Sequence, residues 1–341
     1  MQLRLAQTHI VAEPTLVGAG VWLVIPCYRV REHLPRVIAK APDWVEGIVC
    51  VDDACPEDSV GAVADGADPR VVIVRLAENQ GVGGATLAGY AEAVRRGGRI
   101  IVKVDGDDQM DLGHAARLVA PILLGEADYA KGNRFTSVSH LSSMPAVRVF
   151  GNAALSFAAK MSTGYWNIFD PTNGYTAIEG TVAEQILEKR VSRRFFFETD
   201  LLYHLGTLRA VVRDVPMPAR YGDEVSNIRI GAIIGPFALR HLRNFVRRIV
   251  GEYFVRDFHV ATLESLFGVA SLAFGFGYAL RWIAIREPGQ AASAGVVMAA
   301  ALPVIIGIQL LLQALNFDVQ NVPTRPIHPY LRAIGRIGQG R

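Results

Sequence analysis

Short apolar runs alternate with helix-like segments in the N-terminal part of the chain. The run from Ile100 to Val104 is β-branched and broken only by Lys103, as expected for a central strand buried on both faces. Three earlier runs share this apolar character: Val21–Pro26, Gly47–Val51 and Val71–Leu76. Helices are predicted between them at Glu32–Lys40, at Asp58–Ala64 and in a segment that ends near Arg96. The alternation predicts an α/β fold with a Rossmann-like, mostly parallel sheet flanked by helices.

Two much longer apolar runs occupy the C-terminal part. Ser265–Ile285 is about one bilayer length, and Ala291–Leu315 contains no charged residue. Because about 20 apolar residues span the hydrocarbon core of a bilayer, both runs are predicted as transmembrane helices. The link between them, Arg286–Gln290, contains a Pro-Gly turn and predicts a tight hairpin. A pair of buried core helices is the alternative.

Arginines flank the predicted hairpin on both sides. They precede it at Arg240, Arg243, Arg247, Arg248 and Arg256, and follow it at Arg325, Arg332, Arg336 and Arg341. The positive-inside bias therefore predicts a multi-pass protein of the inner (cytoplasmic) membrane, with the catalytic domain and both termini in the cytoplasm. The residues from Ile230 to Phe258 mix apolar side chains with arginines, which predicts interfacial amphipathic helices whose arginines face anionic headgroups. An ordinary solvated helix face is the alternative.

These patterns predict five parts along the chain. They are an N-terminal segment (1–20), a catalytic domain (21–228), juxtamembrane amphipathic helices (229–260), two transmembrane helices (261–318) and a basic cytoplasmic tail (319–341). The formal net charge is only +3, and no nucleic-acid partner is expected. The three cysteines lack metal-type spacing, and their odd number argues against a disulfide framework. The first twenty residues lack the pattern of a signal peptide.

Oxygen-bearing side chains crowd the end of the Ile100 strand. They are Asp105, Asp107, Asp108, Gln109 and Asp111, and Gly106 supplies a tight turn among them. Ligands of open α/β sheets bind outside the carboxyl ends of the strands. Carboxylates crowded there repel one another unless a cation lies among them, and Mg²⁺ and Mn²⁺ prefer oxygen ligands. The group therefore predicts a divalent-metal site, with a solvated acidic turn as the alternative.

Two further groups follow the earlier strands. Asp52 and Asp53 end the second strand, where one acid can hydrogen-bond a base or ribose; a helix N-cap is the alternative. Gly81, Gly83 and Gly84 follow the third strand, but they do not form the dinucleotide pattern G-x-G-x-x-G. Backbone packed closely against a nucleotide or its phosphates explains the glycines better than NAD binding does.

Four motifs together carry a resemblance to a known family. VIPCY begins at Val24, VDDACPED at Val51, ENQGVGGA at Glu78 and VDGDDQ at Val104. Their order and spacing resemble those of family 2 glycosyltransferases, which have the GT-A fold. Within that family the chain looks most like the dolichyl- and polyprenyl-phosphate sugar synthases, over roughly Val21 to Ile230.

The resemblance implies roles for individual residues. The nucleotide-sugar pocket would be lined by Pro26, Tyr28, Asp52, Asp53, Asn79, Gly84, Asp105, Gly106 and Arg220. Asp105, Asp107 and Gln109 would bind Mg²⁺ or Mn²⁺. Arg134, Arg148 and Asn152 would bind the acceptor phosphate, and Asp107, Arg134 and Arg148 would be the catalytic residues. Guanidinium groups suit this role because they bind phosphate oxygens in a bidentate way.

Other segments match the family less closely. Asp170–Tyr175 and Phe195–Asp200 resemble segments that shape the acceptor side, although Glu198 and Asp200 have helix capping as their alternative. Pro218–Asn227 resembles a loop that closes over the donor, but Asn227 stands where a lysine is common. The acid expected directly after Tyr28 is missing, and no Q-x-x-R-W occurs, which argues against a processive synthase.

The resemblance implies inverting transfer of one sugar from a GDP- or UDP-hexose to a polyprenyl (undecaprenyl or dolichyl) phosphate at the cytoplasmic membrane face. A homo-oligomer is possible. Two other functions stay open. The chain could glycosylate another lipid acceptor, which would need no phosphate clamp, or it could be a non-catalytic membrane scaffold built on a GT-A domain.

Overall fold

The structure is a computed structural model that describes residues 16–64, 66, 68–134, 146–218 and 230–339. The chain divides into two compact units. The first is formed by Met1–Asn244 together with Pro323–Arg341, and the second by Phe245–Val322. The last residues of the chain thus belong to the same unit as the N-terminal part, although the second unit separates them in sequence.

Within the described residues of the first unit, seven strands form one sheet in the order β3-β2-β1-β4-β6-β5-β7. The strands are β1 (Val21–Cys27), β2 (Gly47–Asp52), β3 (Val71–Arg75), β4 (Ile100–Lys103), β5 (Tyr129–Asn133), β6 (Thr176–Glu179) and β7 (Val212–Pro216). β6 runs antiparallel to β4 and β5, and all other neighbours are parallel. The predicted mostly parallel, Rossmann-like sheet is confirmed.

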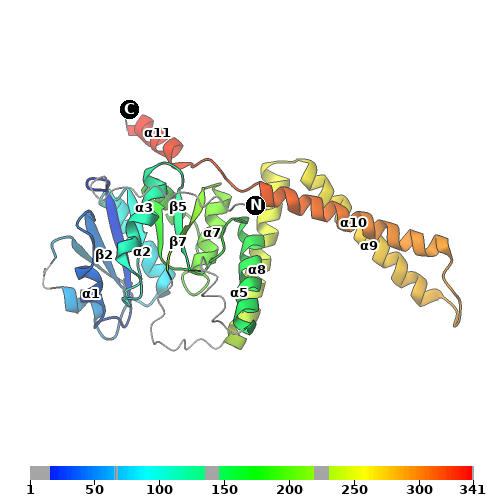
Figure 1. Ribbon diagram of the computed structural model, residues 1–341, viewed down its shortest axis with the longest axis horizontal. Helices are drawn as coiled ribbons and strands as arrows, with labels where there is room; N and C mark the ends of the chain where they lie inside the picture. The colour runs from blue at the N-terminus through cyan, green and yellow to red at the C-terminus, as the bar shows by residue number, and fades with distance from the viewer. Residues whose placement is uncertain (1–15, 65, 67, 135–145, 219–229, 340–341) are drawn as a thin grey trace. The chain divides into compact units, whose positions relative to one another are not determined.

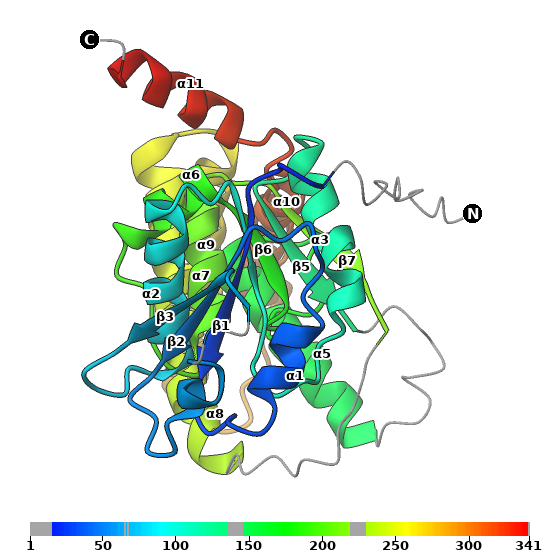
Figure 2. The same ribbon diagram turned by 90° about the vertical axis from the view of Figure 1, so that its left-hand side faces the viewer.

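Helices cover both faces of this sheet. Those of the first unit are α1 (Leu34–Ala39), α2 (Gly81–Arg95), α3 (Ala115–Leu123), α5 (Ala146–Thr163), α6 (Gly180–Leu187), α7 (Phe197–Thr207), the first part of α8 (Ile230–Ile249) and α11 (His328–Gln339), with 3₁₀ turns at Ser59–Val63 and Leu112–His114. Figure 2 shows α2 and α6 on one side of the sheet and α3 on the other. Because β2 and β4 are buried along their whole length, even Lys103 of β4 is shielded from solvent.

The second unit is a helical hairpin. Its helices are α9 (Val260–Ile285) and α10 (Ala294–Gln320), preceded by the end of α8 and a π-helical turn at Val250–Arg256. Both helices are long and apolar enough to cross a membrane, by length and composition. They extend beyond the predicted runs 265–285 and 291–315, mainly at the outer ends.

Glycines allow α9 and α10 to approach closely. A Cβ on Gly268 would lie 2.9 Å from Leu311 Cγ, and one on Gly275 would lie 2.6 Å from Val304 Cγ2. A Cβ on Gly307, from the facing helix, would lie 2.8 Å from Leu272 Cγ. Small residues at such positions are typical of helices that associate in membranes, because they bring the backbones into contact.

One arginine departs from the prediction for the juxtamembrane helices. Arg248 was expected to face lipid headgroups, but its side chain is 1% exposed and lies 2.6 Å from Asp318 of α10. Tyr253 also hydrogen-bonds Asp318. A guanidinium within reach of a buried carboxylate is better paired than exposed, since Asp318 would otherwise be a buried unpaired charge.

Candidate active site

Asp105 and Asp107 form the shared wall of two neighbouring cavities. Both residues follow β4 at the carboxyl end of the parallel strands. A cavity of about 440 Å³ lies on one side and includes both carboxylate residues in its lining. A smaller one, of about 170 Å³, lies on the other side and includes them as well. The sheet thus brings the two aspartates to a point from which two separate ligands could be reached.

The larger cavity contains most of the residues predicted for the donor. It is lined by Pro26 and Tyr28 after β1, Asp53 after β2, Asn79 before α2, and Asp105, Gly106 and Asp107. Arg194 and Phe195, which precede α7, complete one side. Asp52 and Gly84 are not among its lining residues, and Arg220 lies outside the described part of the chain.

Asp53 organises the entrance to α2. Its two carboxylate oxygens accept hydrogen bonds from the backbone N–H groups of Gln80 (2.7 Å) and Gly81 (2.8 Å). Its carbonyl oxygen accepts one from the Asn79 side chain at 3.1 Å. A carboxylate at the N-terminus of a helix is favoured by the helix dipole. Asp53 therefore holds Asn79 beside the larger cavity and also caps a helix distant from it in sequence.

Asp52 has a more structural environment than its neighbour. One of its oxygens accepts the Cys55 N–H at 2.9 Å, and the other lies 3.0 Å from Arg75 Nη1. The side chain is 7% exposed. Asp52 thus joins the end of β2 to the end of β3 at some remove from the cavity.

The glycine cluster packs against the protein's own chain. Gly83 N and Gly84 N both donate to the carbonyl of Arg193. A Cβ on Gly83 would lie 2.6 Å from the ring of Phe197, and one on Gly81, where φ is +80°, would lie 2.8 Å from Arg193 O. The described close approach is therefore to the segment before α7, and of these glycines only Gly81 lines the larger cavity.

The acidic turn after β4 separates its carboxylates into two groups. Asp107 Oδ1 accepts the backbone N–H of Gln109 at 3.1 Å, and Gln109 lines the smaller cavity. Asp108, with φ of +62°, instead pairs with Lys40 Nζ at 2.6 Å. Asp108 lines neither cavity.

Asp105 is held by a buried lysine. Lys103 Nζ lies 2.6 Å from Asp105 Oδ1, and the lysine side chain is 2% exposed. Burial lowers the pKa of Lys103, but the nearby Asp105 and Glu198 carboxylates outweigh it, so that the pKa is raised overall. A Cβ on Gly174 would lie 2.5 Å from this ammonium and 3.0 Å from Asp105 Oδ2. Only glycine leaves room for the pair.

The donor set suits a hard divalent cation that shares its coordination with phosphate. Within the described residues, no group of three His, Cys, Asp or Glu side chains is arranged to hold a metal ion. The wall between the cavities offers two carboxylates, with the Gln109 amide in the smaller cavity. Mg²⁺ commonly binds through one or two carboxylates plus substrate phosphates and water. Asp105, Asp107 and Gln109 fit that mode.

Arg134 stands at the smaller cavity in a fixed orientation. Its Nε lies 2.8 Å from Asp170 Oδ2, and its Nη2 lies 3.2 Å from Asp170 Oδ1. The Asp170 side chain is 1% exposed, whereas that of Arg134 is 37% exposed. A bidentate pair fixes the plane of the guanidinium. Asp170 was not predicted as a site residue, although its segment was.

Two buried titratable groups lie behind Arg134. The Lys131 ammonium donates to the carbonyl of Asn173, and burial lowers the pKa of Lys131 to about 8. Asp214 of β7 accepts hydrogen bonds from Asn133 and from the Phe169 N–H, each at 2.9 Å. Burial raises the pKa of Asp214 to about 6.

Three lining residues of the smaller cavity were missed by sequence reasoning. His114 comes from the 3₁₀ turn before α3, Met110 from the acidic turn, and Met217 from the residue after β7. None carries a pattern of its own. Only the position of Met217 directly after a strand could have indicated it.

The remaining predicted residues fall into two groups. Arg148 and Asn152 lie on α5, but their side chains lie outside the described residues, so their phosphate role stays a prediction. Asp200 accepts hydrogen bonds from Ser192 N (2.7 Å) and Asn244 Nδ2 (2.9 Å), which joins α7 to α8. Glu198 Oε1 lies 3.9 Å from Lys103 Nζ. Neither acid lines a cavity described above, in agreement with the structural alternative.

Comparison with known proteins adds a family. Residues 22–187 match the sequence profile of glycosyl transferase family 2. Polyprenol monophosphomannose synthase of Mycolicibacterium smegmatis is 31% identical over 202 residues, which cover 57% of this chain and 75% of that protein. Undecaprenyl-phosphate mannosyltransferase of Micrococcus luteus is 28% identical over 62% of this chain and 88% of its own. The UDP-N-acetylglucosamine–dolichyl-phosphate N-acetylglucosaminyltransferase of Methanococcus voltae is 23% identical over 62% and 91%.

A solved structure is similar at a lower level. The crystal structure of glucosyl-3-phosphoglycerate synthase from Mycobacterium tuberculosis with Mn²⁺ and UDP-glucose covers 69% of this chain and 82% of its own, with a TM-score of 0.49 and 20% identity. These values are too low to bear on the site.

Proposed function

Since the chain belongs to glycosyl transferase family 2 and is a glycosyltransferase, we propose that it transfers a single sugar, with inversion, from a GDP- or UDP-hexose to a polyprenyl phosphate at the cytoplasmic face of the membrane. The observation that carries this proposal is the position of Asp105 and Asp107, which line two adjacent cavities at once. One cavity would hold the nucleotide sugar and the other the acceptor phosphate.

The larger cavity suits the donor. Its volume of about 440 Å³ falls within the range of small-molecule sites. Apolar and aromatic side chains such as Pro26, Tyr28 and Phe195 give it surfaces for a base, while Asn79 and Arg194 offer polar groups. The diphosphate would lie toward Asp105 and Asp107.

A divalent cation, Mg²⁺ or Mn²⁺, would be held by Asp105, Asp107 and Gln109. When bound, it would offset the charge that develops on the departing nucleoside diphosphate. The protein's own part is to fix these oxygens. Lys103 holds Asp105 from behind, and the Gln109 backbone holds Asp107.

The smaller cavity suits a phosphate. Arg134 lies at its rim with the guanidinium plane fixed by Asp170. The second pKa of a phosphate monoester is about 6, so the acceptor is already ionised at neutral pH and needs little help from a general base. Positioning by Arg134, with Arg148 and Asn152 from α5, would then supply much of the rate enhancement. Attack from a cavity opposite the leaving group is the geometry of an inverting transfer.

The membrane hairpin accounts for a lipid acceptor. With α9 and α10 in the bilayer and both termini in the cytoplasm, the catalytic unit would meet the phosphate of a polyprenyl lipid at the membrane surface. The named relatives that transfer sugars to dolichyl, undecaprenyl or polyprenol phosphates support this acceptor class. They differ in the sugar they carry, so they do not indicate one donor.

The test uses full-length protein in detergent with undecaprenyl phosphate, Mn²⁺ and a panel of UDP- and GDP-sugars, and it follows the lipid fraction by mass spectrometry. The variant is Asp107→Asn. Its matched control is Asp108→Asn, one residue away but paired with Lys40 outside both cavities. A lipid-phosphate sugar made by the wild type and the control but not by Asp107→Asn supports the proposal. Sugar on a neutral lipid, or equal loss in both variants, would overturn it.

A further inference from the structure

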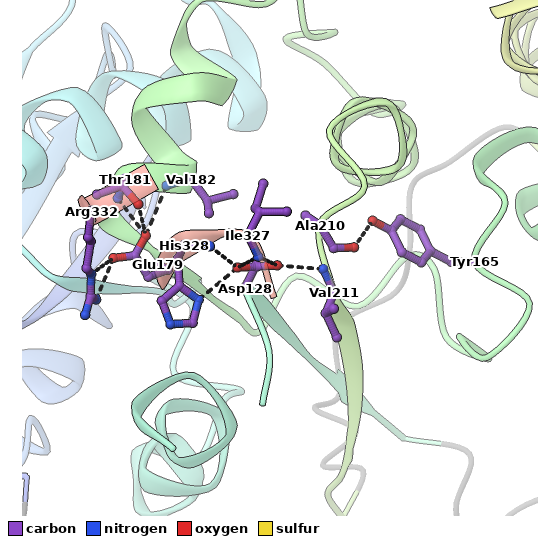
Figure 3. Close-up of polar contacts among 10 residues, drawn as sticks. All are labelled: Asp128, Tyr165, Glu179, Thr181, Val182, Ala210, Val211, Ile327, His328 and Arg332. Atoms are coloured by element: carbon purple, nitrogen blue, oxygen red, sulfur yellow. Dashed lines mark hydrogen bonds and ion pairs between the residues drawn. The ribbon is translucent and has the colours of Figure 1, made fainter. Parts of the chain in front are cut away.

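The residues after the hairpin return to the catalytic unit and bind a buried acid. Asp128, at the start of β5, is fully buried. Its carboxylate accepts the N–H groups of Ile327 (3.0 Å) and His328 (2.9 Å), and His328 Nδ1 lies 2.8 Å from its Oδ1. Val211 N also donates to Asp128 at 2.7 Å (Figure 3). The carboxylate thus joins β5, the segment before β7 and the start of α11.

A second buried acid binds the next turn of α11. Arg332 Nε and Nη2 both lie within hydrogen-bond distance of Glu179 Oε1, at 2.8 and 2.6 Å. The other oxygen of Glu179 caps α6 through Thr181 N (2.8 Å) and Val182 N (3.1 Å), as Figure 3 shows. The Glu179 side chain is 1% exposed. These contacts fix α11 both in position and in rotation about its axis.

The fixed rotation determines which residues α11 presents outward. His328 and Arg332 are one turn apart and face the catalytic unit. Tyr330 and Ile334 follow each of them by two residues, which is roughly 200° around a helix of 3.6 residues per turn. Tyr330 is 69% exposed and Ile334 is 48% exposed. Two large apolar side chains therefore stand together on the outer face.

The charge around this face is of one sign. Residues 319–341 contain four arginines and no acidic residue. Arg325 is exposed just ahead of the helix, and Arg336 follows Ile334 by two positions. Apolar and aromatic residues combined with arginines on one short helix are typical of segments that lie in the headgroup region of anionic membranes.

The length of chain before α11 limits where the helix can be. α10 ends at Gln320, and seven residues, Asn321–Ile327, separate it from His328. An extended chain advances about 3.3–3.6 Å per residue, so the start of α11 lies within roughly 28 Å of the end of α10. A helix tied this closely to a membrane span stays near the surface from which that span emerges.

We propose that the outer face of α11, formed by Tyr330 and Ile334 with their flanking arginines, binds an anionic lipid surface. This inference rests on the membrane hairpin of the proposed function. Because α11 is clamped to Asp128 and Glu179, its contact with lipid would set the orientation of the whole catalytic unit against the bilayer. The surface would act in addition to the juxtamembrane helix α8.

The test places an environment-sensitive fluorophore on single cysteines of the full-length protein in lipid nanodiscs. Cys55 is replaced by serine first, since it is the partly exposed native cysteine, whereas Cys27 and Cys50 are buried. The probe is attached at Ile334→Cys, at Phe276→Cys in α9, and at Leu124→Cys, an exposed apolar position on the catalytic unit away from α11. Discs contain phosphatidylcholine alone or with phosphatidylglycerol.

We expect a blue shift at position 334 that is larger in discs with phosphatidylglycerol, a blue shift at 276 in both lipids, and none at 124. A shift at 276 without one at 334 overturns the proposal for α11 and leaves the hairpin intact. No shift at 276 shows that the hairpin itself is not in the bilayer. A shift at 334 that appears only in discs carrying several copies identifies a second copy as the occupant, which also overturns the proposal.

Discussion

The two ends of the central sheet use carboxylates in opposite ways. Asp105 and Asp107 follow β4 at the carboxyl end of the parallel strands, where they line two cavities. Asp128 precedes β5 and Glu179 ends the antiparallel β6, so both lie at the other end of the sheet. There, each is at most 1% exposed and surrounded by N–H donors from distant parts of the chain.

The difference shows what separates a structural acid from a functional one in this fold. A buried carboxylate that receives donors on both oxygens costs little to keep ionised and fastens segments together. A carboxylate at a cavity keeps part of its surroundings for a ligand. Residue type is the same at both ends, and only the donors around each carboxylate distinguish them. Four substitutions test this contrast, from the largest expected effect to the smallest.

Asp128→Asn should cause the largest loss of stability. An amide cannot accept at both positions where the backbone N–H groups of Val211, Ile327 and His328 converge. Breaking such a buried charged contact costs about 3–5 kcal/mol. Thermal unfolding of the full-length protein in detergent measures it, with Asp108→Asn as the control. An unchanged unfolding temperature would show that α11 is not fastened by this acid.

Asp107→Asn should do the reverse. The free energy of unfolding should stay within about 0.5 kcal/mol of the wild type, as for substitutions away from buried networks. Turnover should fall about 10²–10³-fold, which is the usual effect of removing one electrostatic contact at a reacting centre. Steady-state kinetics and thermal unfolding on the same preparation check both halves. Equal loss of stability and activity would remove the contrast between the two ends.

Arg134→Lys should reduce kcat/KM for the lipid phosphate about 10–100-fold. Lysine keeps the charge but cannot form the bidentate pair with Asp170, and a hydrogen bond to a charged group contributes roughly 1.5–3 kcal/mol. Arg95→Lys, in an exposed pair with Glu92, is the matched control. If both variants keep full activity, the orientation of Arg134 does not matter for the acceptor.

Asp214→Asn should have the smallest effect, and it should depend on pH. Burial raises the pKa of this carboxyl from 3.8 to about 6, so the folded state holds the proton more tightly than the unfolded state does. The ionised carboxylate therefore destabilises the fold above about pH 6, and this cost fades as the pH falls toward 4. The variant should be more stable than the wild type by about 1–2 kcal/mol at pH 7.5 and equal to it near pH 4. A difference that does not change with pH would contradict this origin.

Features encoded by short stretches of sequence could be predicted. The β-branched run before Asp105 made β4 and its metal-type turn recognisable, because strand and ligands are contiguous. The apolar runs of the hairpin are equally local. The carboxylates that line both cavities thus follow from one short motif.

Features that depend on distant residues could not be predicted. Asp170 lies 36 residues from Arg134, and Asp128 lies 200 residues from His328. No periodicity or motif connects such partners, since the fold alone brings them together. The burial of Arg248 was missed for the same reason: its partner, Asp318, is 70 residues away on α10.

The return of the C-terminal residues also sets a condition for any shortened form of this enzyme. A fragment ending at Asn244 would keep the sheet and both cavities but lose the segment Pro323–Arg341 that belongs to the same unit. Asp128 and Glu179 would then lack donors from Ile327, His328 and Arg332. A water-soluble catalytic fragment is therefore better built by joining residue 244 to residue 323 through a flexible linker than by cutting the chain before the hairpin.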